Sequence, residues 1–492
     1  MNRLRDLRAY IDALKDLGDL TEITEPVDEV LELGALVRRT TETCGPARLF
    51  TSVQGAAPGF RALGAPAALS SLPGKRMARV ALGLGLPATA TLREIVEVIT
   101  DGLDKTPIAP QLIDDAPVFQ NTLDGERATL DRFPTPLLHQ DDGGRYVNTY
   151  GTLIVRTPDG SLTNWSIARI MQIDGRHMSG IVGPQQHLGM IWHEWAKLGK
   201  PMPFALVQGP EPAVSVISGT PLPTGVPEGP YLGGYFGEPI EVVRCRTSDL
   251  EVPASAEILI EGHVSPHRDF DEGPMGEFPG YMPRGTTRQP TYTIEAISHR
   301  DDPIWPVVAE GYPTDEYHSV TGTGNAVSAL AGLRKAGLPV ATALMPFEAA
   351  NHVLVVTALA DWRARMPGVS SIEFARRVGR VLDTVHGRTK IPKTYLLDDD
   401  FDPSDPSQLL WALATRVHPA DRRVIREGRI LNLLTCFTAE ETANGHGALA
   451  IHDALRPEDP EGLCTFASAY PEHIRRRVLD LETRYPAPTA SH

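Results

Sequence analysis

Two glutamates flank a turn-forming stretch in the middle of the chain, Glu272-Gly-Pro-Met-Gly-Glu277. Gly273, Pro274 and Gly276 interrupt helices and regular strands, so we expect the chain to turn between the two carboxylates. Such a turn can bring both groups into one pocket, where their repulsion raises the pKa of one of them. A protonated carboxylic acid beside an ionised one can act as a proton donor. A lone pair with this spacing is more often a solvated loop, so the interpretation depends on the rest of the chain.

Three further segments contain residues suited to binding a cation. They are Thr163-Asn-Trp-Ser-Ile-Ala-Arg169, Gln185-Gln-His187 and Ser218-Gly-Thr-Pro-Leu-Pro223, which is followed by Glu228. An amide oxygen, an imidazole and a carboxylate suit Mn²⁺ or Mg²⁺ holding a phosphate better than they suit Zn²⁺. Each residue alone is ordinary, and a single histidine is more often structural than a ligand.

Taken together, these segments resemble the UbiD family of decarboxylases, which use prenylated FMN. The resemblance implies that Asn164, His187 and Glu228 bind the Mn²⁺ or Mg²⁺ that holds the flavin phosphate, with K⁺ as a further ion. It implies that Glu272, Arg169 and Glu277 form the catalytic acid–base trio. The residues that it places around the cofactor, besides the cation ligands and Arg169, are Thr149, Ser166, Ile167, Ala168, Gln186, Ser218, Gly219, Thr220, Pro221 and His386.

The implied reaction is a reversible, non-oxidative decarboxylation of an α,β-unsaturated acid through a covalent adduct with prenylated FMN. No side chain is a good enough electron sink for this reaction, so a cofactor must take the electrons of the breaking bond. Arg169 presents a planar fork of donors that can orient a carboxylate and pair with Glu272. Glu277, crowded by Glu272, is the expected donor of the proton that follows CO₂ loss.

Two alternatives remain open at this point. His386 stands where members acting on phenylacrylates have a lysine, which is compatible with an aromatic or heteroaromatic acid as substrate. Tyr317, His318 and Phe278 are expected to line the pocket, although a core position for Phe278 is equally compatible. An ordinary FMN redox enzyme on the same barrel would not need the paired glutamates. The arginine-rich composition suggests a natural-product member, similar to the tautomycetin-pathway decarboxylase of this family.

Composition limits the partners. The formal net charge of −15 over 492 residues argues against nucleic acid and anionic membranes as partners. The four cysteines are far apart, which argues against a disulfide framework or a structural zinc site. The N-terminus lacks an apolar signal region, and no run approaches the roughly 20 apolar residues of a membrane span. We therefore expect a cytoplasmic protein. Its expected partners are a small unsaturated carboxylic acid, a flavin prenyltransferase that supplies the cofactor, and a second copy in a homodimer.

The elements that position these residues fall into three expected domains. Leucines at helical spacing before Gly18 and a capping box at Thr91 predict helices in an N-terminal α/β domain, residues 1–110. Short apolar runs separated by Gly and Pro predict a β-domain, residues 111–315. The family resemblance makes it a split β-barrel that binds flavin. Residues 316–492 are expected to form an α/β oligomerisation domain with an apolar C-terminal helix, so the fold class is mixed α+β.

One local problem concerns the strand expected from Asn164 to Ile173. Side chains alternate between the two faces of a strand, which places Asn164 and Arg169 on opposite faces. A bulge or strong twist is needed if both address one cofactor; otherwise, the phosphate and the flavin ring lie on different sides.

Overall fold

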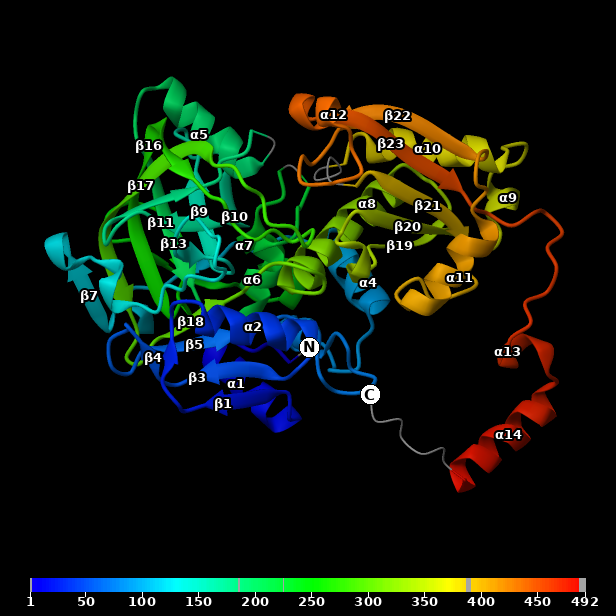
Figure 1. The fold of residues 1–492 in the computed structure, drawn as a ribbon, viewed down its shortest axis with the longest axis horizontal. Helices are drawn as coiled ribbons and strands as arrows, with labels where there is room; N and C mark the ends of the chain where they lie inside the picture. Colours follow the sequence, from blue (N-terminus) through cyan, green and yellow to red (C-terminus); the bar gives the residue numbers. More distant parts are fainter. Residues whose placement is uncertain (1, 185, 224, 386–390, 486–492) are drawn as a thin grey trace.

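The computed structural model describes residues 2–184, 186–223, 225–385 and 391–485. An N-terminal α/β part, a central β-barrel and a C-terminal α/β part pack together, and a helical tail follows (Figure 1). This confirms the predicted mixed α+β class. In the described ranges, no helix has the length and apolar character needed to cross a membrane.

The N-terminal part begins with the helix that its leucine spacing predicts, α1 (Leu7–Leu17). Gly18 ends this helix with a φ of +79°, a left-handed conformation that glycine adopts without strain. Helix α4 (Leu92–Gly102) begins at the predicted capping box, in which Thr91 and Glu94 satisfy each other's backbone amides. The other elements of this part are β1 (Leu20–Ile23), β2 (Val27–Asp28), α2 (Glu32–Glu42), β3 (Ala47–Phe50), β4 (Val53–Gln54), β5 (Arg61–Gly64) and α3 (Ala78–Gly83).

The N-terminal sheet has the strand order β1-β3-β5-β18. Strand β18 (Ile304–Val307) pairs in parallel with β5, from Ile304 opposite Arg61 to Val307 opposite Gly64. The last strand of this sheet therefore comes from far along the chain, after the barrel strands. The N-terminal sheet is consequently completed by a strand of the central part, which ties the first two parts of the molecule together.

The barrel is one sheet with the order β10-β9-β13-β16-β17-β12-β11-β8, and β7 pairs with β17. Strands β10 and β11 belong to opposite ends of this path, yet only Ala168 and Arg169 separate them in the chain. The ends of the sheet therefore meet, and the barrel is nearly closed. The strands are β7 (Asn121–Asp124), β8 (Tyr146–Asn148), β9 (Thr152–Arg156), β10 (Thr163–Ile167), β11 (Ile170–Gln172), β12 (His177–Gly180), β13 (Met202–Gln208), β16 (Ile258–Glu272) and β17 (Thr287–His299).

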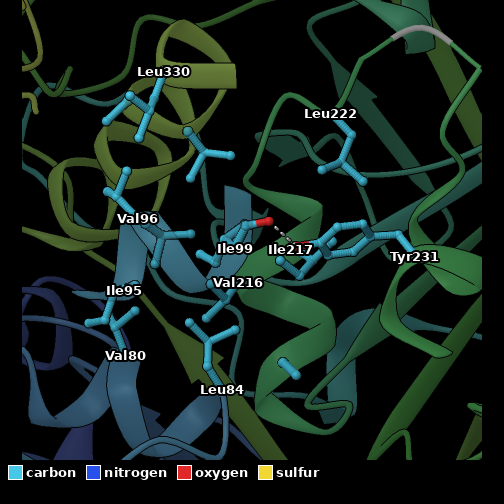
Figure 2. Close-up of a cluster of buried hydrophobic side chains, with 14 of the residues drawn as sticks. Val80, Leu84, Ile95, Val96, Ile99, Val216, Ile217, Leu222, Tyr231 and Leu330 are labelled. Carbon is cyan, nitrogen blue, oxygen red and sulfur yellow. Dashed lines mark hydrogen bonds between the residues drawn. The ribbon is translucent and has the colours of Figure 1, made fainter. Parts of the chain in front are cut away.

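Helices pack around the barrel and join the three parts. Those between barrel strands are α5 (His187–Lys197), α6 (Pro212–Ser218) and α7 (Glu228–Phe236). A small separate sheet has the order β15-β14-β6 and consists of β6 (Gln111–Leu112), β14 (Glu241–Arg244) and β15 (Glu251–Pro253). Figure 2 shows side chains of α3, α4, α6, α7 and α8 in one apolar cluster. In its centre, Tyr231 of α7 donates a hydrogen bond from Oη to the Ile99 carbonyl of α4 at 2.7 Å.

The C-terminal part is a five-stranded sheet with the order β19-β20-β21-β23-β22, preceded by the π-helical turn η4 (Tyr317–Gly322). Figure 1 shows the last two helices extending away from the body of the molecule. The elements are α8 (Thr323–Lys335), β19 (Val340–Leu344), β20 (Val353–Ala358), α9 (Trp362–Arg365), α10 (Ser371–Leu382), β21 (Lys393–Asp398), α11 (Pro406–Arg416), β22 (Arg423–Arg429), α12 (Ala439–Asn444), β23 (His446–Asp453), α13 (Phe466–Ala469) and α14 (Glu472–Arg484).

Candidate active site

Arg169 lies at the seam where the barrel closes. Strand β10 pairs with β9, whereas β11 pairs with β12 and β8, so the chain changes partners at Ala168 and Arg169. The side chain of Asn148 braces this point, because its Nδ2 donates to the carbonyls of Ala168 at 2.7 Å and Gly151 at 3.0 Å. The seam is thus held by a buried amide.

The continuous strand predicted from Asn164 to Ile173 is wrong. It is interrupted at Ala168 and Arg169, where the backbone leaves one pairing partner for another. Strict alternation of faces therefore does not extend from Asn164 to Arg169, and the conflict between these two positions disappears. Periodicity in one segment cannot show this break, because it carries no information about the neighbouring strands.

Arg169 and the two glutamates come together as predicted. Glu272, the last residue of β16, accepts two hydrogen bonds from Arg169, from Nε at 3.1 Å and from Nη2 at 2.9 Å. Glu277 follows the turn at Gly273 and Pro274, and its Oε1 contacts Arg169 Nη1. The Glu272 side chain is fully buried, and those of Arg169 and Glu277 are 16% and 12% exposed. One guanidinium therefore joins both carboxylates in a largely buried site.

Tyr146 is a member of this site that the sequence did not reveal. Its hydroxyl lies 3.2 Å from both Glu272 Oε1 and the Pro274 carbonyl, to which it can donate. Burial, and secondarily the negative charge of Glu272, raise the pKa of Tyr146, so it stays a neutral donor. Burial opposes the charge on Arg169, but the two glutamates outweigh it and raise the pKa of the guanidinium. Nothing in the local sequence around Tyr146 signals this contact, which spans more than a hundred residues.

Two of the three predicted cation ligands are in contact. Asn164 Nδ2 donates to Glu228 Oε1 at 3.3 Å, and the backbone amide of Trp165 donates to Glu228 Oε2 at 3.0 Å. Asn164 Oδ1 is buried and has no hydrogen-bond partner among the described residues. Burial raises the pKa of Glu228 to about 7. An unpartnered amide oxygen beside a buried carboxylate fits a divalent cation, which would supply the missing positive charge.

His187, the third predicted ligand, is the first residue of α5, and Gln186 is the N-cap of this helix. Burial lowers the pKa of His187, which favours the neutral imidazole that ligation requires. Its convergence with Asn164 and Glu228 on one cation stays a prediction. Within the described ranges, no group of three or more His, Cys, Asp or Glu could hold a metal ion. The predicted set contains only two residues of those types, because its third ligand is an amide.

The remaining predicted cofactor residues differ in whether their side-chain hydroxyls already form hydrogen bonds within the protein. Ser166 Oγ is buried without a hydrogen-bond partner in the described structure, which is compatible with its predicted role in cofactor binding. The other three hydroxyls have protein partners at 3.0 Å. That of Ser218 bonds Thr152 Oγ1, that of Thr220 donates to the Val216 carbonyl, and that of Thr149 accepts from the Val308 amide.

Apolar contacts bring other members of the predicted set together. A Cβ on Gly219 would lie 2.6 Å from Val320 Cγ1 and 3.4 Å from Ile167 Cδ1, so this glycine lets the loop approach both side chains. A Cβ on Gly324 would lie 2.6 Å from Thr220 Cα and 3.0 Å from Pro221 Cδ. The segment 218–221 is thereby fixed against η4 and α8. His386 lies outside the described residues.

Phe278 is both buried and close to the trio. Its ring stacks on that of Tyr317 with the centroids 3.7 Å apart, and only 4% of the residue is exposed. It directly follows Glu277, so a position in the core and a position next to the predicted pocket are compatible with each other. Tyr317 and His318 meet it from η4, the first turn of the C-terminal part.

The chain matches three consecutive domain models of 3-octaprenyl-4-hydroxybenzoate carboxy-lyase. The N-terminal domain matches residues 11–99, the Rift-related domain residues 111–313 and the C-terminal domain residues 318–451. The chain is 40% identical to the pyrrole-2-carboxylic acid decarboxylase of Pseudomonas aeruginosa and 38% identical to ferulic acid decarboxylase 1 of Saccharomyces cerevisiae, with 99% of both chains covered in each case.

Solved structures have the same fold. The vanillic acid decarboxylase of Sedimentibacter hydroxybenzoicus superposes with a TM-score of 0.83 at 22% identity, covering 98% of this chain and 99% of that one. An evolved dimeric form of HmfF from Pelotomaculum thermopropionicum, solved in complex with prenylated FMN, gives 0.77 at 23% identity, covering 94% and 97%.

Proposed function

The chain belongs to the UbiD family of prenylated-FMN-dependent carboxy-lyases, and from this premise we propose that its substrate is an acid whose carboxylate is attached to an aromatic or heteroaromatic ring. The observation that carries the proposal is the similarity to the pyrrole-2-carboxylic acid decarboxylase, which extends over both chains nearly completely and so includes the pocket. It favours a ring-bound carboxylate over the acyclic acid that the sequence motifs suggested first. A cinnamate-type acid is the second candidate, because of the similarity to ferulic acid decarboxylase 1.

A cation bound at the buried atoms around Asn164 and Glu228 would suit the cofactor phosphate. Asn164, His187 and Glu228 would hold Mn²⁺ or Mg²⁺, with the unpartnered oxygen of Asn164 as one ligand. Ser166, with its unpartnered hydroxyl, would bind the same group. When bound, prenylated FMN supplies the electron sink for the bond to CO₂.

Arg169 would bind the substrate carboxylate through its Nη1 edge. Glu272 occupies Nε and Nη2 with both of its oxygens and stays in place, since it is the end of a paired strand. An incoming carboxylate would therefore replace Glu277 at Nη1. Once it has lost this positive partner in a largely buried site, Glu277 favours its protonated form and takes up a proton from solvent through its exposed edge. It can then deliver the proton to the carbon atom that has lost CO₂.

The test is CO₂ release by protein produced together with a flavin prenyltransferase. We expect pyrrole-2-carboxylate or a related ring acid to give the highest kcat/KM in a panel that includes cinnamate and an acyclic α,β-unsaturated acid. A clear preference for either of the latter two would overturn the substrate proposal. It would leave the family assignment intact.

The roles of the trio are tested by Glu277→Gln and Arg169→Ala. Glu277→Gln keeps size and hydrogen bonding but removes the transferable proton, so kcat is expected to fall by a factor on the order of 10² or more. Arg169→Ala removes the carboxylate clamp and should weaken substrate binding as well as turnover. Glu295→Gln is the control, because Glu295 lies on β17 and pairs with His263 on the exterior. Native kcat in Glu277→Gln would place the proton donor elsewhere.

A further inference from the structure

Two aspartate–histidine pairs hold the backbone on either side of Glu277. One consists of His139 and Asp142, the other of Asp315 and His318, and in each the two residues are three positions apart. We propose that Asp142 and His318 are positioning residues, which fix the main chain at Glu277 so that only its side chain moves during the reaction. This inference rests on the proposed role of Glu277 as proton donor.

Asp142 holds the residue before Glu277. Its Oδ1 accepts a hydrogen bond from the backbone amide of Gly276 at 2.8 Å. Its Oδ2 accepts one from the backbone amide of His139 at 3.0 Å, and the His139 ring lies against the same carboxylate, with Nδ1 3.1 Å from Oδ2. The Asp142 side chain is fully buried. The adjacent amide of Gly143 donates to the Pro274 carbonyl at 2.7 Å, so one short loop holds the turn at two points.

His318 holds the residue after Glu277. Its Nε2 lies 2.9 Å from the carbonyl oxygen of Phe278. A carbonyl can only accept, so Nε2 carries the proton and donates it. The other ring nitrogen, Nδ1, lies 3.0 Å from the backbone amide of Asp315 and 2.9 Å from its Oδ1. The bond to Phe278 therefore exists whether the ring is neutral or protonated.

Asp315 connects this histidine to the N-terminal part of the molecule. Arg38 of α2 donates from Nη1 to Asp315 Oδ2 at 3.1 Å, and the backbone amides of Gly311 and Tyr317 also donate to this carboxylate, at 2.9 Å and 3.0 Å. Burial alone would raise the pKa of Asp315, but His318 and Arg38 lower it, so the group stays ionised. The His318 ring is thereby fixed by a fully buried charge.

These contacts hold the backbone around Glu277 and leave its side chain as the part that would move during the reaction. The amide of Glu277 donates to the Tyr281 carbonyl at 3.1 Å, and its carbonyl accepts from Gly280 at 2.9 Å, which closes the turn. With Gly276 and Phe278 held as well, three consecutive residues have fixed backbone positions. A carboxylate that must leave Arg169 and then reach a carbon atom needs such an anchor, because a displacement of about 1 Å can cost on the order of 10²-fold in rate.

The test uses His318→Leu and Asp142→Ala as disruptive variants and His318→Gln as the rescue, since a glutamine amide can donate from nearly the position of Nε2. His299→Gln is the matched control. His299 is also buried and bonds a backbone carbonyl, that of Arg300 at 2.8 Å, but it lies at the end of β17 remote from Glu272.

Two measurements are made. In protein without cofactor, amide hydrogen exchange of residues 273–282 should be faster in His318→Leu and Asp142→Ala and native-like in His318→Gln and His299→Gln. In the holoenzyme, kcat should fall about 10- to 100-fold in the disruptive variants, while KM changes by less than about twofold. Glu277→Gln combined with Asp142→Ala should be little slower than Glu277→Gln alone, because the positioning residue acts through Glu277.

The outcomes separate the two hypotheses. If Glu277→Gln is slow but Asp142→Ala and His318→Leu turn over normally, the positioning inference is wrong and the donor role stands. If Glu277→Gln itself is native-like, the donor role fails first. Should His318→Leu not accumulate as folded protein, Asp142→Ala decides alone, because its side chain contacts the turn from a separate loop. A loss of kcat in His318→Gln equal to that in His318→Leu would also contradict the inference.

Discussion

The two glutamates that share Arg169 are held in different ways. Glu272 ends a long strand and pairs with Thr287 of β17, and its carboxylate accepts bonds from Arg169 and Tyr146. Glu277 belongs to a loop and meets the same guanidinium at Nη1. The first is therefore suited to hold the arginine, and the second to exchange partners during the reaction. Residue type alone does not make this distinction.

At the same scale, the proposed cation site predicts the behaviour of Glu228→Ala. Removing this carboxylate would take away the negative ligand of that site, so protein produced with the prenyltransferase should contain little divalent metal and little flavin. Elemental analysis and the flavin absorbance of the purified protein measure this. Glu261→Ala is the control, because it removes another buried carboxylate of the same barrel. Full flavin content in Glu228→Ala would refute the ligand assignment.

A second residue-scale prediction concerns Glu316, which the chemistry above does not use. It is fully buried, its Oε2 has no hydrogen-bond partner within the described ranges, and burial followed by the charge of Asp315 raises its pKa to about 7. The folded protein accommodates the neutral carboxylic acid but not the buried charge. Protonation of Glu316 therefore stabilises the fold fully below pH about 4.5, and this stabilisation is lost as the pH rises through about 7.

Glu316→Gln should remove that pH dependence. At pH 8 the variant should be more stable than the native protein by about 2–4 kcal/mol, because ionising Glu316 in the folded protein costs roughly 1.4 kcal/mol for each pH unit between 4.5 and about 7. Near pH 5 the two proteins should differ little. Thermal denaturation at both values provides the measurement. If the native protein and the variant have the same thermal stability at pH 8, ionisation of Glu316 does not destabilise the fold.

At the scale of elements, the sequence predicted those helices whose ends are determined by residues close to them in the chain. Helices α1 and α4 were predicted from their periodicity, Gly18 and the capping box at Thr91, all of which lie within a few residues of the helix ends. The trio was predicted because its residues carry a family motif. The break in the strand at Ala168 was not, because it depends on which strands lie on either side.

The residues that hold Glu272 and the turn at Glu277 could not be predicted from the sequence for the same reason. Tyr146, Asp142 and His318 reach the turn from other elements, and the contact of Tyr146 with Glu272 spans 126 residues. No spacing rule connects such positions in a single sequence. Whether His187 joins the cation site, and the domain boundaries themselves, stay predictions.

The close approach of two loops predicts the effect of Gly143→Ala. A Cβ at this position would lie 2.0 Å from the carbonyl oxygen of Gly273, which forces the backbone of the turn between Glu272 and Glu277 to move. We expect kcat to fall at least tenfold and the free energy of unfolding to decrease by about 1–3 kcal/mol. The control is Gly285→Ala, since a Cβ there meets nothing within 4 Å. Equal kcat values for the two variants would contradict the prediction.

For the whole molecule, the C-terminal helix predicts a dimer. Helix α14 lies away from the body in Figure 1, and Ile474, Val478 and Leu481 share one face of it; Ile474 and Leu481 are 39% and 37% exposed. An exposed apolar face of this kind is typical of an interface, and we expect a second copy to cover it. Light scattering should give about twice the 53.5 kDa of one chain.

The matching variant carries Ile474→Asp and Leu481→Asp, which should shift the particle to the mass of one chain. Leu410→Asp is the control, because Leu410 is an exposed leucine of α11 in the same part of the molecule. A native protein that scatters as a monomer at micromolar concentration would exclude the interface. A dimer that survives both aspartates would place the interface on another surface.

The strand order of the N-terminal sheet has a consequence for synthesis on the ribosome. Strand β5 emerges early, but its neighbour β18 is made only roughly 240 residues later, which takes on the order of 10–50 s at about 5–20 residues per second. Throughout that time β5 presents an open edge to other chains. Fast translation and early chaperone binding should therefore raise the yield of this protein more than that of one whose first domain is complete in sequence.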